Sequence, residues 1–214
     1  MIGGYETVET FFGNLSGVKL DFGCGVGMIW EGFIGVDVFG ASRIPKECRD
    51  RYRQADWTNP EEPIFSEFAG LVCCITIRHL ITCTPREKVL QALKNVYNVL
   101  KVGGYLLIAE CDMVLFLQAV SRNDVSLLGK EFTNWVRSLK TFYKIQDEET
   151  WETLLNCGMR GQGEILWRYS QRTLIDLLKE GGFQNPEYLP KDDKRASKFT
   201  HGYPDEDMVF LLQK

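Results

Sequence analysis

The sequence predicts an α/β fold in which a mostly parallel sheet presents a ligand site at the carboxyl ends of its strands. A short apolar strand at 18–22 leads directly into a turn with glycine at positions 23, 25 and 27. A second apolar run, 70–76, has the length of a fully buried central strand. A helical pattern separates it from a third run at 105–110. In open α/β sheets, ligands bind outside the carboxyl ends of the strands, where this glycine turn would lie.

Length and composition favour one globular domain spanning residues 1–214. The chain has a net charge of −4 and shows no strongly basic patch, which disfavours bulk nucleic acid as a partner. Its seven cysteines form no C-x-x-C pair, so we expect no metal site and reduced thiols. No apolar run is long enough to span a membrane, and residues 1–17 do not resemble a signal peptide. We therefore expect a cytoplasmic protein.

The link between the first two strands is unusually short. The second strand is expected at 33–38, so only residues 28–32 separate it from the glycine turn. Parallel strands normally need about a dozen or more residues between them, so this link cannot hold a crossover helix. We expect Trp30 and Phe33 to cover that face of the sheet instead.

The spacing of the glycines distinguishes two classes of nucleotide site. A dinucleotide fingerprint would need a third glycine at Met28 and an acid about 20 residues later. The chain instead reads D-x-G-x-G-x-G from Asp21, and Asp37 comes only ten residues after Gly27. This pattern resembles motif I of the class I S-adenosylmethionine-dependent methyltransferases. The stretches LKVGGYLLIAE at 100–110 and SQRTLIDLLKEGGF at 170–183 resemble later motifs of the same family.

The resemblance covers 18–110 and 170–214 and implies the topology. We expect a Rossmann-like, seven-stranded, mostly parallel sheet of order 3-2-1-4-5-7-6 with an antiparallel last strand. A helical insert at about 111–169 would follow strand five, with a long helix from 123 or 124 to about 144. We also expect Thr84 to cap the helix after strand four, with Glu87 completing a capping box, and Ser170 to cap the helix before strand six.

The resemblance also implies S-adenosylmethionine as the cofactor and assigns its contacts. The glycine turn would pass under the homocysteine and ribose parts. Asp21 would help hold the turn and the cofactor's ammonium group, and Asp37 would accept both ribose hydroxyls. Asp56 and Trp57 would meet the adenine, although Asp56 might equally cap the turn at 58–60. The expected cofactor residues are Asp21, Gly23, Cys24, Gly25, Gly27, Asp37, Asp56, Trp57 and Cys74.

The catalytic assignments are less specific. His79 follows a strand end and is a candidate base for a hydroxyl or amine acceptor, with a purely structural role as the alternative. Glu110 and Asp112, just past strand five, are further candidates near the substrate mouth, and His201 is a weaker one. The motifs of amino-methylating and cytosine-methylating DNA enzymes are missing.

We therefore expect methyl transfer to oxygen or nitrogen of a small-molecule substrate. Two alternatives stay open. One is a catalytically silent member of the fold that binds the cofactor or a partner protein. The other is an NAD-dependent oxidoreductase, against which Met28 and the early Asp37 speak.

Overall fold

A computed structural model describes residues 12–25, 29–122, 124–128, 168–190, 193, 195 and 207–214. Gly27, His201, nearly all of the expected long helix and nearly all of the loop before the last strand lie outside these described residues. No helix among the described residues is long and apolar enough to cross a membrane.

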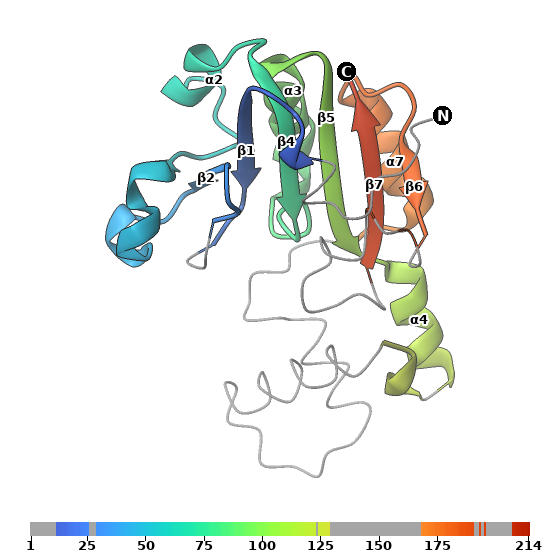
Figure 1. The fold of residues 1–214 in the computed structure, drawn as a ribbon. Helices are drawn as coiled ribbons and strands as arrows, with labels where there is room; N and C mark the ends of the chain where they lie inside the picture. The colour runs from blue at the N-terminus through green and yellow to red at the C-terminus, as the bar shows by residue number, and fades with distance from the viewer. Residues whose placement is uncertain are drawn as a thin grey trace.

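Seven strands form one sheet in the order β3-β2-β1-β4-β5-β7-β6, which confirms the expected topology (Figure 1). Strands β1 to β5 pair in parallel, and β7 runs antiparallel to both β5 and β6. The strands are β1 Val18–Phe22, β2 Ile34–Asp37, β3 Tyr52–Gln54, β4 Val72–Arg78, β5 Leu100–Cys111, β6 Glu187–Leu189 and β7 Asp207–Gln213.

Helices α3 and α7 cover one face of this sheet, behind the strands in Figure 1. Just past α7, Phe183 packs against the Tyr97 ring of α3 in a T-shaped arrangement, with 5.2 Å between the ring centroids. Ser170 caps α7 in a capping box with Thr173, as expected for the cap. The described helices are α2 Pro63–Glu67, α3 Arg86–Val99, α4 Met113–Arg122 and α7 Gln171–Glu180, with 3-10 helices η1 Ala41–Arg43, η2 Lys46–Arg51 and η3 Val125–Leu128.

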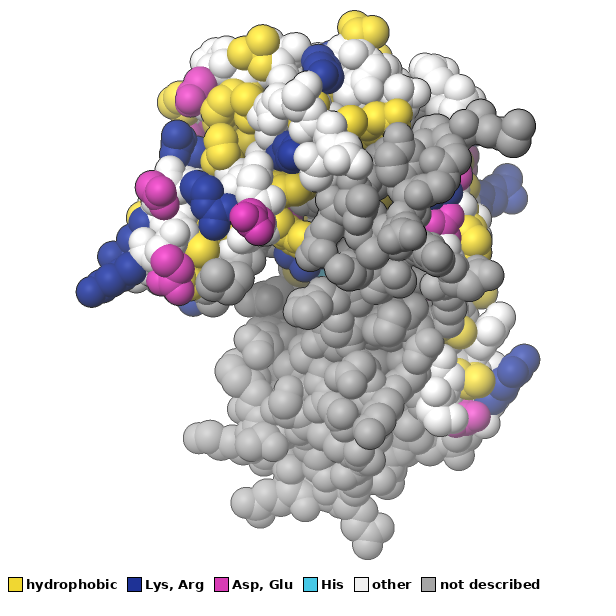
Figure 2. All heavy atoms as spheres, in the orientation of Figure 1, with side chains coloured by type: hydrophobic (Ala, Val, Ile, Leu, Met, Phe, Trp, Pro, Cys, Tyr) yellow, Lys and Arg dark blue, Asp and Glu magenta, His cyan; other side chains and the backbone are white. Residues whose placement is uncertain are grey.

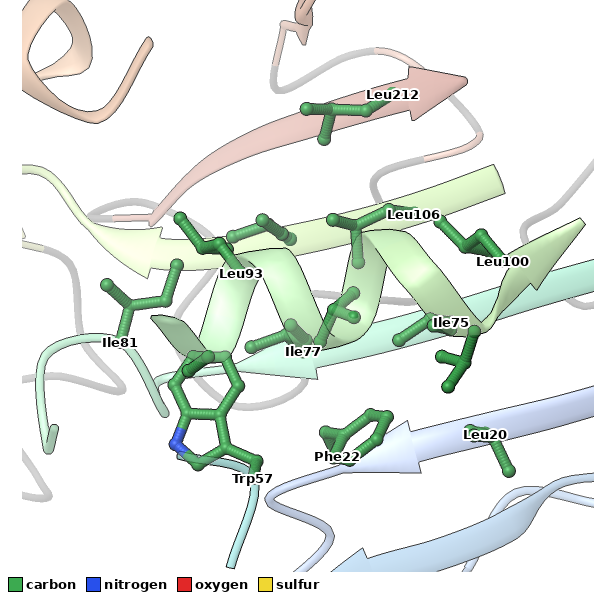
Figure 3. Packing of buried hydrophobic residues seen from close by; sticks show 14 of the residues in the cluster. Leu20, Phe22, Trp57, Ile75, Ile77, Ile81, Leu93, Leu100, Leu106 and Leu212 are labelled. Carbon is green, nitrogen blue, oxygen red and sulfur yellow. The ribbon is translucent and has the colours of Figure 1, made fainter. Parts of the chain in front are cut away.

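The main core lies between the sheet and α3 (Figure 3). Leu93 of α3 and Ile75, Ile77 and Leu106 of the central strands are fully buried there. Burying one such side chain contributes about 1.5–3 kcal/mol, so this layer supplies much of the stability. A second cluster covers the opposite face and includes Phe33, with Trp30 packed against it, as the short first link led us to expect.

Two helix predictions are wrong in detail. Thr84 does not cap α3: the cap residue is Pro85, and no side chain bonds the free N–H groups there. The Thr84 hydroxyl accepts a hydrogen bond from the Trp57 indole at 3.0 Å and donates to the Leu80 carbonyl at 2.7 Å. After β5, α4 begins at Met113, within the expected helical insert but ahead of the expected long helix, and a 3-10 turn at 125–128 stands where that long helix was expected to begin.

Candidate functional site

The glycine turn after β1 is tied to the end of β2. Gly23 and Gly25 have φ of 71° and 66°, in the left-handed region that favours glycine. The Gly23 N–H donates to the Val36 carbonyl at 2.8 Å, and the Gly25 N–H donates to Asp37 Oδ2 at 2.9 Å. The other Asp37 oxygen, Oδ1, accepts the Val38 N–H at 2.7 Å. The Asp37 carboxylate therefore holds the turn open against the strand end.

A cavity of about 560 Å³ opens at this edge of the sheet. Its volume lies in the range of sites for small molecules and cofactors. The strands contribute their carboxyl ends, as expected for an open α/β sheet. Its lining includes Gly23, Gly25, Asp37, Asp56, Trp57, Thr58, Arg78, His79, Leu80, Cys83 and Lys88.

Asp21 lies beneath this edge, next to Arg78. Asp21 is 1% exposed, and its Oδ1 accepts the Thr76 hydroxyl at 2.6 Å. Its Oδ2 lies 3.5 Å from Arg78 Nη2, and no other hydrogen bond reaches it from the described residues. Burial raises the pKa of Asp21, although Arg78 and Thr76 oppose the shift. Arg78, in turn, lies over the Trp30 ring at 5.2 Å and faces the cavity.

Asp56 and Trp57 line the far end of the cavity. Asp56 Oδ1 accepts both the backbone N–H and the hydroxyl of Thr58, at 2.9 and 2.8 Å, so the turn-capping alternative is observed. The Trp57 side chain is buried and its indole N–H is taken by Thr84.

His79 links two side chains from neighbouring strands. Its backbone has φ of 51°, and its N–H donates to the Ala109 carbonyl at 2.9 Å. Its ring places Nδ1 3.6 Å from Cys111 Sγ and Nε2 3.3 Å from Asp207 Oδ2. Burial lowers the pKa of His79, but the charges of Asp207 and Cys111 outweigh it and raise that pKa well above its usual range. These three side chains are also close enough together to be considered as metal ligands.

Glu110 is not at the substrate mouth, contrary to expectation. Strand β5 runs through residue 111, so Glu110 is still inside the sheet and its side chain is fully buried. Its Oε1 accepts the Ile81 N–H at 2.8 Å. Burial raises the pKa of Glu110 to about 7, against the lowering effect of His79 and of the bond from Ile81. Glu110 therefore supports the loop that carries His79 and does not line the cavity.

Two expected cofactor cysteines point elsewhere. Strand β4 continues two residues beyond its predicted end, to Arg78, so Cys74 lies mid-strand between Lys19 and Tyr105 and is fully buried. The Cys74 side chain therefore does not line the cavity. Cys24 belongs to the glycine turn, but its thiol is buried in the second cluster; burial, Asp21 and Asp37 raise the pKa of that thiol to about 12.

The sequence analysis missed Arg78, Cys111 and Asp207. Arg78 was overlooked because the predicted strand ended before it. The proximity of Cys111 and Asp207 to His79 depends on β7 inserting beside β5, which pairs residues 96 positions apart: Cys111 stands opposite Asp207.

Figure 2 shows acidic and basic side chains interspersed over the visible described surface, with no extended basic area. Among the described residues on that side, this agrees with the net charge of −4 and shows no basic patch of the kind that binds nucleic acid.

Comparison with known proteins identifies the fold. No protein-family model and no curated protein matches the chain. A methyltransferase from Methanosarcina mazei described as SAM-dependent superimposes with a TM-score of 0.53 at 17% identity, over 95% of this chain and 96% of that one. A SAM-dependent methyltransferase from Archaeoglobus fulgidus gives 0.50 at 16% identity, over 92% and 85%.

A structure described as PigF with SAH gives a TM-score of 0.51 at 16% identity, over 92% of this chain but only 50% of that one. The present chain thus spans about half the length of that protein. Sequence identities this low relate backbones and leave activities open. From strand order and superposition together, the chain has the fold of the class I S-adenosylmethionine-dependent methyltransferases.

Proposed function

We propose that this protein is an S-adenosylmethionine-dependent methyltransferase that methylates an oxygen or nitrogen of a small-molecule acceptor. The observation that carries the proposal is the glycine turn at Gly23 and Gly25, fixed by Asp37 and opening onto a 560 Å³ cavity. A dinucleotide enzyme is less well supported, because the acid that ends β2 follows the turn too early.

The residues present fit this cofactor. Each Asp37 oxygen accepts one backbone N–H and keeps a further lone pair, so the carboxylate can still accept the two ribose hydroxyls. Asp21 is buried beneath the cavity with one oxygen that, among the described residues, only Arg78 approaches, so it could reach the ammonium group only if Arg78 shifted. Asp56 has one carboxylate oxygen outside its turn and faces the cavity, where it suits the adenine amino group.

A bound sulfonium cofactor supplies an electrophilic methyl group. The chain then mainly has to hold an acceptor in line with it, and such positioning can supply about 7–11 kcal/mol. His79 faces the cavity and is the proposed base. Because Asp207 stabilises its protonated form, His79 would accept a proton only above the ordinary pH range of histidine.

The compartment and organisation are also proposals. We infer a single domain in the cytoplasm, since all six described cysteines are free. In an oxidising compartment, thiols of this number usually pair.

Calorimetry and thermal unfolding with S-adenosylhomocysteine test the cofactor assignment. At a ligand concentration of 100 times Kd, the free energy of unfolding should rise by about 2.7 kcal/mol. NAD serves as the control ligand. If NAD binds and S-adenosylhomocysteine does not, the oxidoreductase is favoured. If neither ligand binds, the cofactor site is refuted.

Transfer of a labelled methyl group to a panel of alcohols, phenols and amines tests the activity. Labelled product from any of these acceptors supports the proposed methyltransferase activity. Cofactor binding without transfer to any acceptor class would favour the catalytically silent alternative.

A further inference from the structure

Cys111, His79 and Asp207 form a chain of contacts across three elements of the sheet. Antiparallel pairing of β5 and β7 sets Cys111 directly opposite Asp207. His79 follows β4, and its imidazole places Nδ1 3.6 Å from the Cys111 sulfur and Nε2 3.3 Å from the Asp207 carboxylate. The imidazole thus lies between a thiol and a carboxylate, one at each ring nitrogen.

The burial of Asp207 determines the charge on this imidazole. The Asp207 side chain is fully buried, and no hydrogen bond from a described residue other than His79 reaches either of its oxygens. A buried carboxylate is costly unless a cation accompanies it, so Asp207 favours the protonated form of His79. The pKa of His79 is raised accordingly, against the effect of burial.

The other ring nitrogen of His79, Nδ1, faces the Cys111 sulfur, so the positive charge of the protonated ring lies next to that thiol. An imidazolium beside a cysteine stabilises the thiolate, which is the nucleophilic form. The Cys111 side chain remains partly exposed, so a small reagent can reach it. Cys83 is the other described cysteine of intermediate exposure.

A metal ion is the competing explanation for the same three side chains. However, Nδ1 faces Cys111 whereas Nε2 faces Asp207. One ring cannot direct both nitrogens at a single ion, so the contacts suit a Cys–His–Asp triad, with an ion pair between His79 and Asp207, better than a metal centre.

We propose that Cys111 is a nucleophilic thiol that exchanges with low-molecular-weight disulfides at the edge of the cofactor cavity. The Cys111 thiolate attacks one sulfur of the disulfide, a new S–S bond forms, and the original S–S bond breaks. The released thiolate takes the proton held by His79, so the step is balanced without another oxidant. Because His79 lines the cavity, the adduct would stand beside it and hinder access.

Oxidised glutathione is the probe, applied to the full chain, with peptide mass mapping of every cysteine over time. We expect Cys111 to acquire the glutathionyl group about tenfold faster than Cys83, as thiolate stabilisation by a neighbouring cation implies. The variant H79Q should remove this preference and leave the rate at Cys83 unchanged. D207N should have the same effect more weakly, since the ring keeps its place but loses its counter-charge.

Circular dichroism of each variant establishes that it is folded, and H79Q suffices if D207N does not fold. Equal rates at Cys111 and Cys83 in the unsubstituted protein would overturn the proposal, as would an unchanged rate at Cys111 in folded H79Q. One zinc ion bound per chain and protecting Cys111 would also overturn it, in favour of a metal site. None of these outcomes depends on methyl transfer or on cofactor binding.

Discussion

Arg78 lines the cavity, and its Nη2 lies 3.5 Å from the carboxylate of Asp21, which is buried beneath it. The amino-acid end of the proposed cofactor carries one ammonium and one carboxylate, and Arg78 complements the carboxylate. Replacing Arg78 by Gln should therefore weaken the binding of S-adenosylhomocysteine by about 10- to 100-fold, the equivalent of one lost charged hydrogen bond.

5′-Methylthioadenosine lacks the amino-acid end and serves as the comparison ligand. Its Kd should be unchanged in R78Q, as measured by calorimetry. Lys88→Gln, which removes another cavity-lining charge, is the matched control and should change the Kd values of both ligands by the same factor. Equal losses for both ligands in R78Q would show that Arg78 does not contact the amino-acid end.

Glu110 makes stability depend on pH. Its pKa is about 7 in the folded chain against 4.5 for a free glutamate side chain, so the folded state holds the proton more tightly. Stability from this group is therefore present below about pH 4.5 and is lost as pH rises toward 7, by roughly 3 kcal/mol in total.

Glu110→Gln retains an acceptor for the Ile81 N–H but cannot ionise. Urea unfolding at several pH values should show E110Q gaining stability over the unsubstituted protein between about pH 4.5 and 7. A constant difference across that range would contradict a raised pKa.

The glycine turn offers a matched pair of substitutions. A Cβ at Gly23 would meet Leu80 atoms at 3.1 Å, whereas a Cβ at Gly25 meets nothing within 4 Å and points into open space. Both positions have positive φ, which costs an L-residue about 1–2 kcal/mol.

We expect G23A to lower stability more than G25A, because only G23A adds a steric contact to the backbone strain. G25A should instead mainly weaken the binding of S-adenosylhomocysteine, since the methyl group of the new alanine would enter the cavity. Thermal unfolding and calorimetry separate the two effects. A G25A protein that binds the ligand unchanged would place the cofactor elsewhere.

The Thr84 hydroxyl joins two elements and does not cap a helix. Thr84→Val removes the acceptor for the buried Trp57 N–H and should cost roughly 1–3 kcal/mol. The double variant W57F/T84V no longer has that N–H, so the effect of T84V should be smaller in the W57F background. Urea unfolding of the four proteins measures this coupling, and additive losses would contradict it.

The same residue shows where reading single elements fails. Thr-Pro-x-Glu is a typical start of a helix, and α3 does begin just after it. The hydroxyl nevertheless bonds to Trp57, 27 positions away, because a buried indole needs an acceptor. Element existence followed from local patterns, whereas the partners of side chains depended on tertiary contacts that no local pattern contains.

Across the whole molecule, burial is concentrated at the centre of the sheet. Leu20, Ile75, Ile77 and Leu106 are fully buried, while the edge strands β3 and β6 have only three residues each. We expect the amides of β4 to exchange with solvent only on global unfolding, and those of β3 and β6 earlier. Hydrogen-exchange mass spectrometry tests this order, and equal protection throughout the sheet would contradict it.

The order of the strands was predictable from the resemblance, and the glycine turn from residue spacing alone. The place of Arg78 in the cavity wall was not predictable, because an error of two residues at a strand end decides which side chain faces the cavity. The contact of His79 with Asp207 was also missed, since it depends on the exact register of β7 against β5, which the strand order does not specify.

The hydrogen bond from Gly25 to Asp37 has one further consequence. Because it joins two parts of the protein itself, this stretch of main chain should lose little freedom when a nucleoside arrives. Association of the cofactor should then be fast, and the dissociation rate of the complex should chiefly determine the affinity for the demethylated cofactor.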